Sequence, residues 1–144
     1  MSFDIYFIAM KRGKNSVIPM LETLKAFEGH CELERIVQHR DDETHIWWES
    51  LSGDSKWGYI TINAFEGDEK LCRDISVNCP TCDPMFWKTM FGLMEKFPLG
   101  MVFPTTNMRW VLANESFRED FQADDMSIEI VSTSEALCET ISND

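Results

Sequence analysis

Residues Leu71–Phe97, LCRDISVNCPTCDPMFWKTMFGLMEKF, contain the pattern that decides the fold. Apolar and polar residues alternate up to Cys79, a period of two that predicts a β-strand with one face inward. Pro80 cannot donate a hydrogen bond to a neighbouring strand, so we expect the strand to end before it. A helix is then predicted to begin at Asp83, because Asp is a favoured N-cap and Pro84 suits the first helical position.

The predicted helix is apolar around most of its circumference between Met85 and Phe97. Its polar edge consists of Lys88, Thr89, Glu95 and Lys96. A helix with so narrow a polar edge must be covered on more than one side. Pro98 follows it and is a strong helix-ending signal. The sequence therefore predicts a strand and a buried helix at the centre of the protein.

The residues before this stretch predict one helix and four further strands. Phe3–Met10 is apolar on both faces except for Asp4, which predicts a central strand buried on both sides. Ser16–Phe27 has apolar residues at helical spacing, with Pro19 in the first turn. The alternating segments predict strands at Glu32–His39, Thr44–Ser50 and Trp57–Phe65, with a turn at Ser52–Ser55 before the last of them.

The residues after Phe97 predict short strands and two helices. The strands are expected at Met101–Phe103, Met108–Leu112 and Met126–Val131. A short helix is expected to start at Asn114 or Ser116 and to continue through Phe121. The last helix is predicted at Glu135–Ile141, with Ser132 and Glu135 forming a capping box.

These elements predict one α+β domain spanning residues 1–144, with a mixed, largely antiparallel sheet and about three to four helices packed mainly on one face. No apolar run approaches the ~18 residues of a membrane-spanning helix, so we expect no membrane contact. The first residues lack the basic and apolar regions of a signal peptide. Five cysteines at irregular spacing are typical of free thiols, which favours a cytoplasmic location.

The charge of the chain is unevenly distributed. The net charge is −12, and residues 113–144 contain nine acidic residues but only one basic residue, Arg118. Such a charge repels nucleic acid and anionic membranes. It attracts a basic protein and accelerates the encounter with it. A negative charge of this size also keeps a small protein soluble, and that interpretation remains open.

An aromatic face is predicted on the strand Trp57–Phe65. Alternation places Trp57 and Tyr59 on the face opposite Ile60 and Ile62. Aromatic side chains beside polar groups are typical of protein interfaces, although a covering helix would make them core residues instead. The candidate partner-binding residues are Trp47, Trp57, Tyr59, Asp120, Asp124, Asp125 and Glu129.

Thiol chemistry is an alternative function. Cys79 and Cys82 form a Cys-x-x-Cys motif, in which Cys79 would be the nucleophile and Cys82 the resolving thiol of a thiol-disulfide oxidoreductase. Pro84 argues against it, because a helix that starts after the motif stabilises a thiolate less. Joining Cys72 and a histidine to this pair does not give the spacing of a structural zinc site. We therefore predict no metal and no cofactor.

The three histidines, His30, His39 and His45, show no partner or pocket that a general base needs. The absence of a recognisable catalytic arrangement favours a non-catalytic protein.

The second half of the chain resembles small bacterial immunity proteins of polymorphic-toxin systems. The similar segments are ISVNCPTCDPMFWKTMFGLM at 75–94, MVFPTTNMRWVLANES at 101–116 and MSIEIVSTSEALCETI at 126–141. The resemblance implies an acidic cytoplasmic α+β domain that blocks a cognate toxin by binding it. We therefore expect a non-catalytic binding protein with a basic protein partner. A structural or assembly protein, such as a homodimer formed through an exposed sheet face, is a further alternative.

Overall fold

The computed structural model describes residues 4–39, 46–65, 68–78, 80–81, 83–103, 108–122 and 126–142, except for the side chains of residues 37–39, 46–49 and 142. The described strands are β1 (Asp4–Lys11), β2 (Lys14–Asn15), β3 (Ile18–Pro19), β4 (Glu34–His39), β5 (Ile46–Ser55), β6 (Gly58–Phe65), β7 (Asp68–Asn78), β8 (Leu99–Val102), β9 (Arg109–Leu112) and β10 (Ser127–Ile130). The described helices are α1 (Met20–Phe27), α2 (Pro84–Lys96), the 3-10 helix η1 (Glu115–Phe121) and α3 (Ser134–Ser142).

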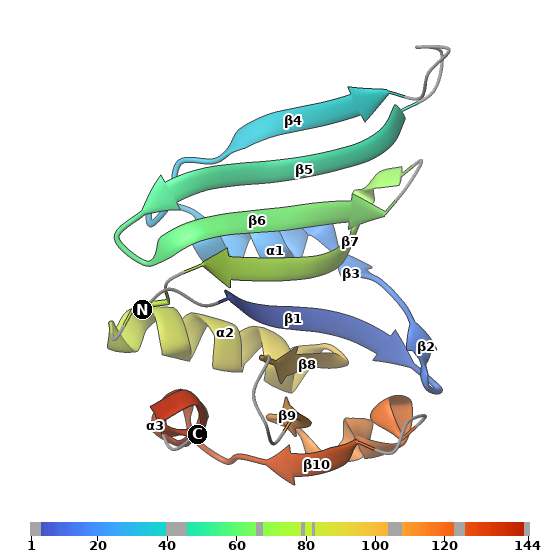
Figure 1. Ribbon diagram of the computed structural model, residues 1–144, viewed down its shortest axis with the longest axis vertical. Coiled ribbons are helices and arrows are strands. Elements are labelled where there is room, and N and C mark those ends of the chain that lie inside the picture. Colours follow the sequence, from blue (N-terminus) through green and yellow to red (C-terminus); the bar gives the residue numbers. More distant parts are fainter. Residues whose placement is uncertain are drawn as a thin grey trace.

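The strands form one mixed sheet in the order β10-β9-β8-β1-β7-β6-β5-β4, with β2 paired to β1 and β3 paired to β7 (Figure 1). Every pair is antiparallel except β10 and β9, which are parallel. The parallel pair is possible because η1 provides the crossover between its two strands. This arrangement confirms the predicted α+β class with a mixed, largely antiparallel sheet.

The three α-helices pack on one face of the sheet, which confirms that part of the prediction. In Figure 1, α1 lies behind β6 and β7. Aromatic rings form the middle of this core, where the Phe86 ring of α2 makes edge-to-face contacts with Phe7, Trp57 and Trp87 at centroid distances of 6.5, 5.6 and 4.9 Å. Edge-to-face pairs of this kind add to the energy gained by burial alone.

A second, smaller core lies on the opposite face, at the β10 end of the sheet. There η1 inserts Phe121 against Trp110 of β9, with ring centroids 4.9 Å apart. Gly100 of β8 makes room for it, since a Cβ atom at this position would lie 2.6 Å from the Phe121 ring. Only this end of the second face is covered by a described helix.

Helix α2 begins where the sequence predicts. The Asp83 carboxylate accepts a hydrogen bond of 2.9 Å from the Met85 amide, and Pro84 is the first helical residue. The helix buries Phe86, Trp87, Met90, Leu93 and Met94. Glu115–Phe121 also begins as predicted, because the Asn114 carboxamide accepts a hydrogen bond of 3.0 Å from the Ser116 amide.

The starts of α1 and α3 differ from the prediction. Helix α1 begins at Met20 rather than at Ser16, because Ile18 and Pro19 pair with Cys72 and Leu71 of β7 as a short strand. Helix α3 begins at Ser134, and its cap is Thr133, whose hydroxyl accepts a hydrogen bond of 3.0 Å from the Ala136 amide. The predicted capping box of Ser132 and Glu135 is therefore wrong by one residue.

The turn between β5 and β6 is also displaced. The sequence predicted a turn at Ser52–Ser55, but these residues continue β5, and the chain reverses at Lys56 and Trp57. Ser55 accepts a hydrogen bond from the Trp57 amide, while Gly58 has a φ of 108°, which favours glycine. This shift reverses the direction in which Trp57 points.

Strand β1 is central, as predicted, with β7 and β8 on either side. Ile5, Phe7 and Ala9 are fully buried beneath the helices. On the other face Met10 is buried in the second core, but Tyr6 is 36% exposed, so the prediction of burial on both faces is wrong at Tyr6.

Candidate functional site

The strands from β4 to β1 leave one broad face without a helix among the described residues. We call it the open face and define it by the residues that alternate with the buried core positions of β4, β5, β6, β7 and β1. Directly paired residues in a sheet point to the same side, so the register identifies its members. One row is Glu34, Ser52, Thr61, Ser76 and Tyr6; a second is Ile36, Ser50, Asn63, Asp74 and Ile8; a third is Asp54, Tyr59, Asn78 and Asp4.

Short polar side chains form the floor of the open face. Ser50, Ser52 and Asn63 are only 4, 5 and 8% exposed. The Ser52 hydroxyl donates to the Thr61 hydroxyl across 3.2 Å, and the Asn63 carboxamide donates to Asp74. This floor is therefore held in place by cross-strand hydrogen bonds.

Larger apolar side chains rise above the floor. Tyr6, Ile36 and Tyr59 are 36, 42 and 42% exposed, and Phe65 at the end of β6 is 47% exposed. Single exposed apolar residues are common on proteins, but several around one polar floor form a surface of the type that binds other proteins. Tyr59 is thus exposed rather than covered by a described helix, and its contact with a partner stays a prediction.

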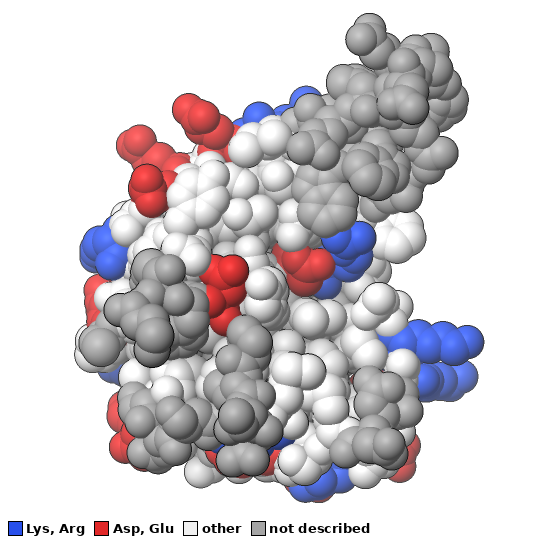
Figure 2. Space-filling view, viewed as in Figure 1, with Lys and Arg blue, Asp and Glu red and all other residues white. Residues whose placement is uncertain are grey.

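The charges at these open-face positions have one sign. Glu34, Asp54, Asp74 and Asp4 are acidic, and none of the positions in the three rows is Lys or Arg. Arg73, at a β-bulge, partly neutralises the face through an ion pair of 3.0 Å with Asp74. Figure 2 shows uncharged atoms over the middle of this side, acidic groups at several places among them, and basic groups mainly near its edges.

Trp57 is a core residue, which corrects the prediction that it contacts a partner. Its ring is completely buried, stacks on His30 at a centroid distance of 4.6 Å, and donates a hydrogen bond of 3.1 Å to the Asp83 carboxylate. The hydrogen bonds from the Met85 amide and from Trp57 hold the pKa of Asp83 below its usual value. Trp57 therefore joins the β5–β6 turn to the start of α2.

Some of the acidic residues in the C-terminal quarter form contacts within the protein. Glu129 forms an ion pair of 3.2 Å with Arg109. Asp120 accepts a hydrogen bond of 3.2 Å from the Arg12 amide and fixes the turn between β1 and β2. Both residues have structural roles, and the prediction that they steer a partner has no support from this geometry.

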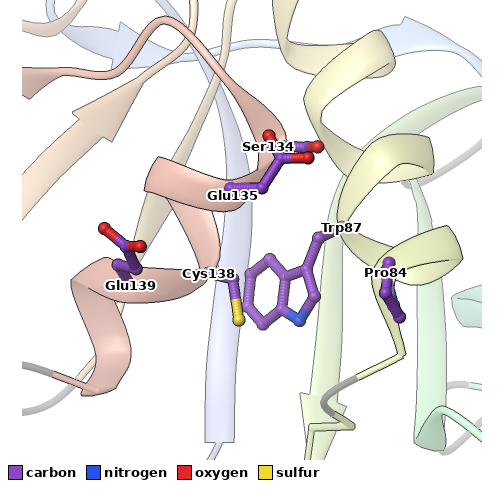
Figure 3. Close-up of a pocket in the computed structure, with 6 residues that line it drawn as sticks. All are labelled: Pro84, Trp87, Ser134, Glu135, Cys138 and Glu139. Atoms are coloured by element: carbon purple, nitrogen blue, oxygen red, sulfur yellow. The ribbon is translucent and has the colours of Figure 1, made fainter.

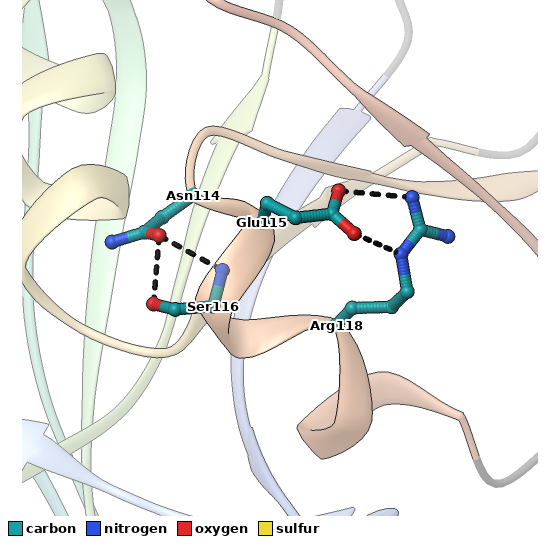
Figure 4. A network of polar contacts seen from close by, with 4 residues as sticks. All are labelled: Asn114, Glu115, Ser116 and Arg118. Carbon is teal, nitrogen blue, oxygen red and sulfur yellow. Dashed lines mark hydrogen bonds and ion pairs between the residues drawn. The ribbon is translucent and has the colours of Figure 1, made fainter.

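An acidic residue of η1 also contacts another residue of the protein. Glu115 and Arg118 form two hydrogen bonds of 2.7 and 3.0 Å, beside the Asn114 cap (Figure 4). The Arg118 guanidinium lowers the pKa of Glu115. Of the other candidates, Asp124 and Asp125 lie outside the described residues, and so does the side chain of Trp47.

A pocket lies between the start of α2 and α3, away from the open face (Figure 3). It has a volume of about 240 Å³ and is lined by Pro84, Trp87, Ser134, Glu135, Cys138 and Glu139. The Trp87 ring forms its base but is only 1% exposed, and its nitrogen already donates to the Thr81 carbonyl. In Figure 3 the Glu139 carboxylate points away from the ring, so these groups do not converge on one ligand atom.

Among the described residues, no geometry supports thiol or metal chemistry. Cys79 and Cys82 lie outside the described residues, but α2 starts at Pro84, so both cysteines precede its N-cap. Burial raises the pKa of the Cys31 thiol, and it raises that of Cys72 to about 12. Within the described parts of the chain, no three His, Cys, Asp or Glu side chains lie close enough to hold a metal ion.

Tyr6 is the open-face residue that the sequence reasoning missed. It lies inside the apolar run of β1, where the pattern indicated burial on both sides. Asp4 could have revealed it, because residues 4 and 6 of a strand point to the same side and a charged residue indicates an exposed side. The Asp4 carboxylate accepts a hydrogen bond of 3.4 Å from the Tyr6 hydroxyl.

Comparison of the chain with protein-family models, with curated proteins and with solved structures gives no significant match. None of the described helices has the length and apolar character needed to cross a membrane.

Proposed function

We propose that this protein is a non-catalytic binding protein that engages a basic protein through the open face of its sheet. The observation that carries the proposal is the open face itself. It combines a fixed polar floor, exposed Tyr6 and Tyr59, and four carboxylates. Tyrosine is among the residues enriched in interface hot spots, because it contributes a large contact area with few rotatable bonds.

Charge supports a basic protein as the partner. The carboxylates of Glu34, Asp54 and Asp4 lie at the margin of the open face and favour a positively charged surface opposite them. Two copies of this chain that met through the same face would bring like charges together, which is unfavourable. Charge therefore supports a basic protein over a homodimer at this surface.

The resemblance to immunity proteins suggests what kind of basic protein this is. A toxin that acts on nucleic acid carries a positive surface, and an acidic binding face is complementary to it. Neutralisation of such a toxin by occlusion is the specific form of the proposal, and it requires no catalytic group on this chain.

The contribution of Tyr59 tests the proposal. We expect a basic protein to be captured from native cell extract at low salt by the wild-type chain. The Tyr59→Ala variant should retain it at least about thirtyfold less tightly, because an interface hot spot contributes about 2 kcal/mol or more. Affinity would be measured by calorimetry with the captured protein after purification.

Met85→Ala is the matched control, since Met85 is a similarly exposed apolar residue, 47% exposed, on α2. It should retain the partner as the wild type does. Equal affinity of the Tyr59→Ala and Met85→Ala variants, or a captured protein without a basic surface, would contradict the proposal.

A further inference from the structure

We infer that the open face holds an arginine side chain of the partner between the rings of Tyr6 and Tyr59, above Ser76 and Asn78. This inference rests on the proposed function and specifies which partner group the surface receives. The strand register, the exposed fractions and the distribution of carboxylates carry it.

The register places the two tyrosines diagonally across one strand. Tyr6 pairs with Ser76, Tyr59 pairs with Asn78, and both partners lie on β7 between the two tyrosine-bearing strands. Neighbouring strands are about 4.8 Å apart and each residue rises about 3.4 Å, so the two Cα atoms are about 12 Å apart. Side chains as long as tyrosine can approach each other from this separation and leave a slot between them.

The bottom of the slot is polar and small. Ser76 and Asn78 are half-buried, and the Asn78 carboxamide donates a hydrogen bond to Asp4. The serine hydroxyl and the remaining lone pairs of the asparagine oxygen are acceptors that suit an N–H donor. No bulky side chain stands between the rings at these two positions, so a planar group has room to enter.

Carboxylates lie at the slot and beyond it. Asp4 pairs with Asn78 and borders one end of the slot, and Asp54 pairs with Tyr59 on the side of that residue away from the slot. Burial and the Asp4 carboxylate raise the pKa of Tyr6, which therefore remains a neutral phenol at pH 7. Lys56, three positions before Tyr59 in the sequence, lies over the Trp57 ring at 5.9 Å.

A guanidinium group satisfies each of these features. It is planar and stacks on aromatic faces, it always carries a positive charge, and its fixed N–H groups can donate to a carboxylate at its edge, here that of Asp4. An ammonium group is a compact, strongly hydrated charge and gains less from two flanking rings. The arrangement therefore favours arginine over lysine.

The test uses the full-length chain labelled with ¹⁵N and N-acetyl-arginine amide as the probe. Saturable chemical-shift changes are expected at the backbone amides of Tyr6, Tyr59, Ser76 and Asn78. N-acetyl-citrulline amide has nearly the same shape without the charge and should cause no saturable change. N-acetyl-lysine amide should bind several-fold more weakly.

Variants of the two rings complete the test. Tyr6→Ala and Tyr59→Ala should each raise the dissociation constant about fivefold, the loss expected for one cation–π contact. Tyr6→Phe retains the ring and should bind nearly as well as the wild type, and Met85→Ala on α2 should have no effect. The ¹⁵N spectrum of each variant shows whether it is folded.

Equal binding of the arginine and citrulline probes, equal binding of arginine and lysine, or shift changes confined to other surfaces would overturn the inference. Failure here is distinguishable from failure of the proposed function. If a basic partner binds in a Tyr59-dependent way but Tyr6→Ala has no effect on it, the slot is wrong and the binding face stands. If Tyr59→Ala leaves the partner's affinity unchanged, both are wrong.

Discussion

Asp83 connects the start of α2 to the β5–β6 turn through one carboxylate. The carboxylate caps α2 and accepts a hydrogen bond from the Trp57 indole N–H in the β5–β6 turn. The backbone amide of Asp83 donates a hydrogen bond of 3.1 Å to the Thr81 hydroxyl. Local sequence predicted the cap, because Asp before Pro is a strong helix start. It did not predict the bond to Trp57, since the two residues are 26 positions apart.

The lowered pKa of Asp83 predicts a pH-dependent stability. A carboxyl group whose pKa is lower in the folded state stabilises the fold above its unfolded pKa of about 4, and this contribution is lost as the pH falls through the folded value. Asp83→Asn should therefore be less stable than the wild type at neutral pH, and the difference should shrink in acid. Urea unfolding between pH 7 and the acid range measures it; parallel pH profiles would contradict the assignment.

Two glycines should respond to alanine with opposite signs. Gly100→Ala places a methyl group against the buried Phe121 ring at 2.6 Å, and overpacking of this kind costs about 1–3 kcal/mol. Gly92→Ala adds a methyl group to α2 with no atom within 4 Å, and should stabilise the protein by about 0.5–1 kcal/mol. Thermal unfolding of both variants provides the comparison, and an unchanged or raised melting temperature of Gly100→Ala would show that η1 is not packed on Gly100.

At the scale of elements, hydrogen-bonded caps and pairings decide where each segment begins. Helix α1 is shorter than its apolar periodicity indicates, because Ile18 and Pro19 pair with β7 instead. Ser52–Ser55 has the composition of a turn but belongs to β5, where its small residues pair with β6. Local propensity is overruled in both segments by contacts with strands distant in sequence.

The start of α3 offers a sharp test at this scale. Thr133→Ala removes the hydroxyl that accepts the Ala136 amide and should cost about 1 kcal/mol, whereas Ser132→Ala should be nearly neutral. Both residues are exposed, so neither change affects the core. Chemical denaturation would report the two values, and a larger loss for Ser132→Ala would restore the capping box predicted from sequence.

At the scale of the whole molecule, the sequence predicted the α+β class and the buried helix, but only part of the candidate site. Alternation placed Tyr59 on the face opposite Ile60 and Ile62, as the structure has it, because that placement depends only on the alternation of side chains along the strand. Trp57 was misplaced because the turn lies at Lys56 and Trp57, three residues later than predicted, where the Trp57 side chain enters the core. Tyr6 was missed because the burial of a strand face depends on where helices pack, and the apolar sequence of β1 does not contain that information.

The negative charge of the molecule also acts at this scale. A net charge of −12 gives every acidic surface some attraction for a basic partner. A charge reversal therefore identifies the binding face only when it is compared with an equal reversal elsewhere. Asp54 on the open face and Glu139 on α3 are both exposed, which makes them a suitable pair.

The most direct test of the central claim is the association rate constant of the captured basic partner with the Asp54→Lys and Glu139→Lys variants at low ionic strength. If the open face is the binding surface, Asp54→Lys should slow association several-fold more than Glu139→Lys, and the difference should diminish at high salt. Equal rate constants for the two variants, or a slower rate for Glu139→Lys, would show that the partner binds another surface.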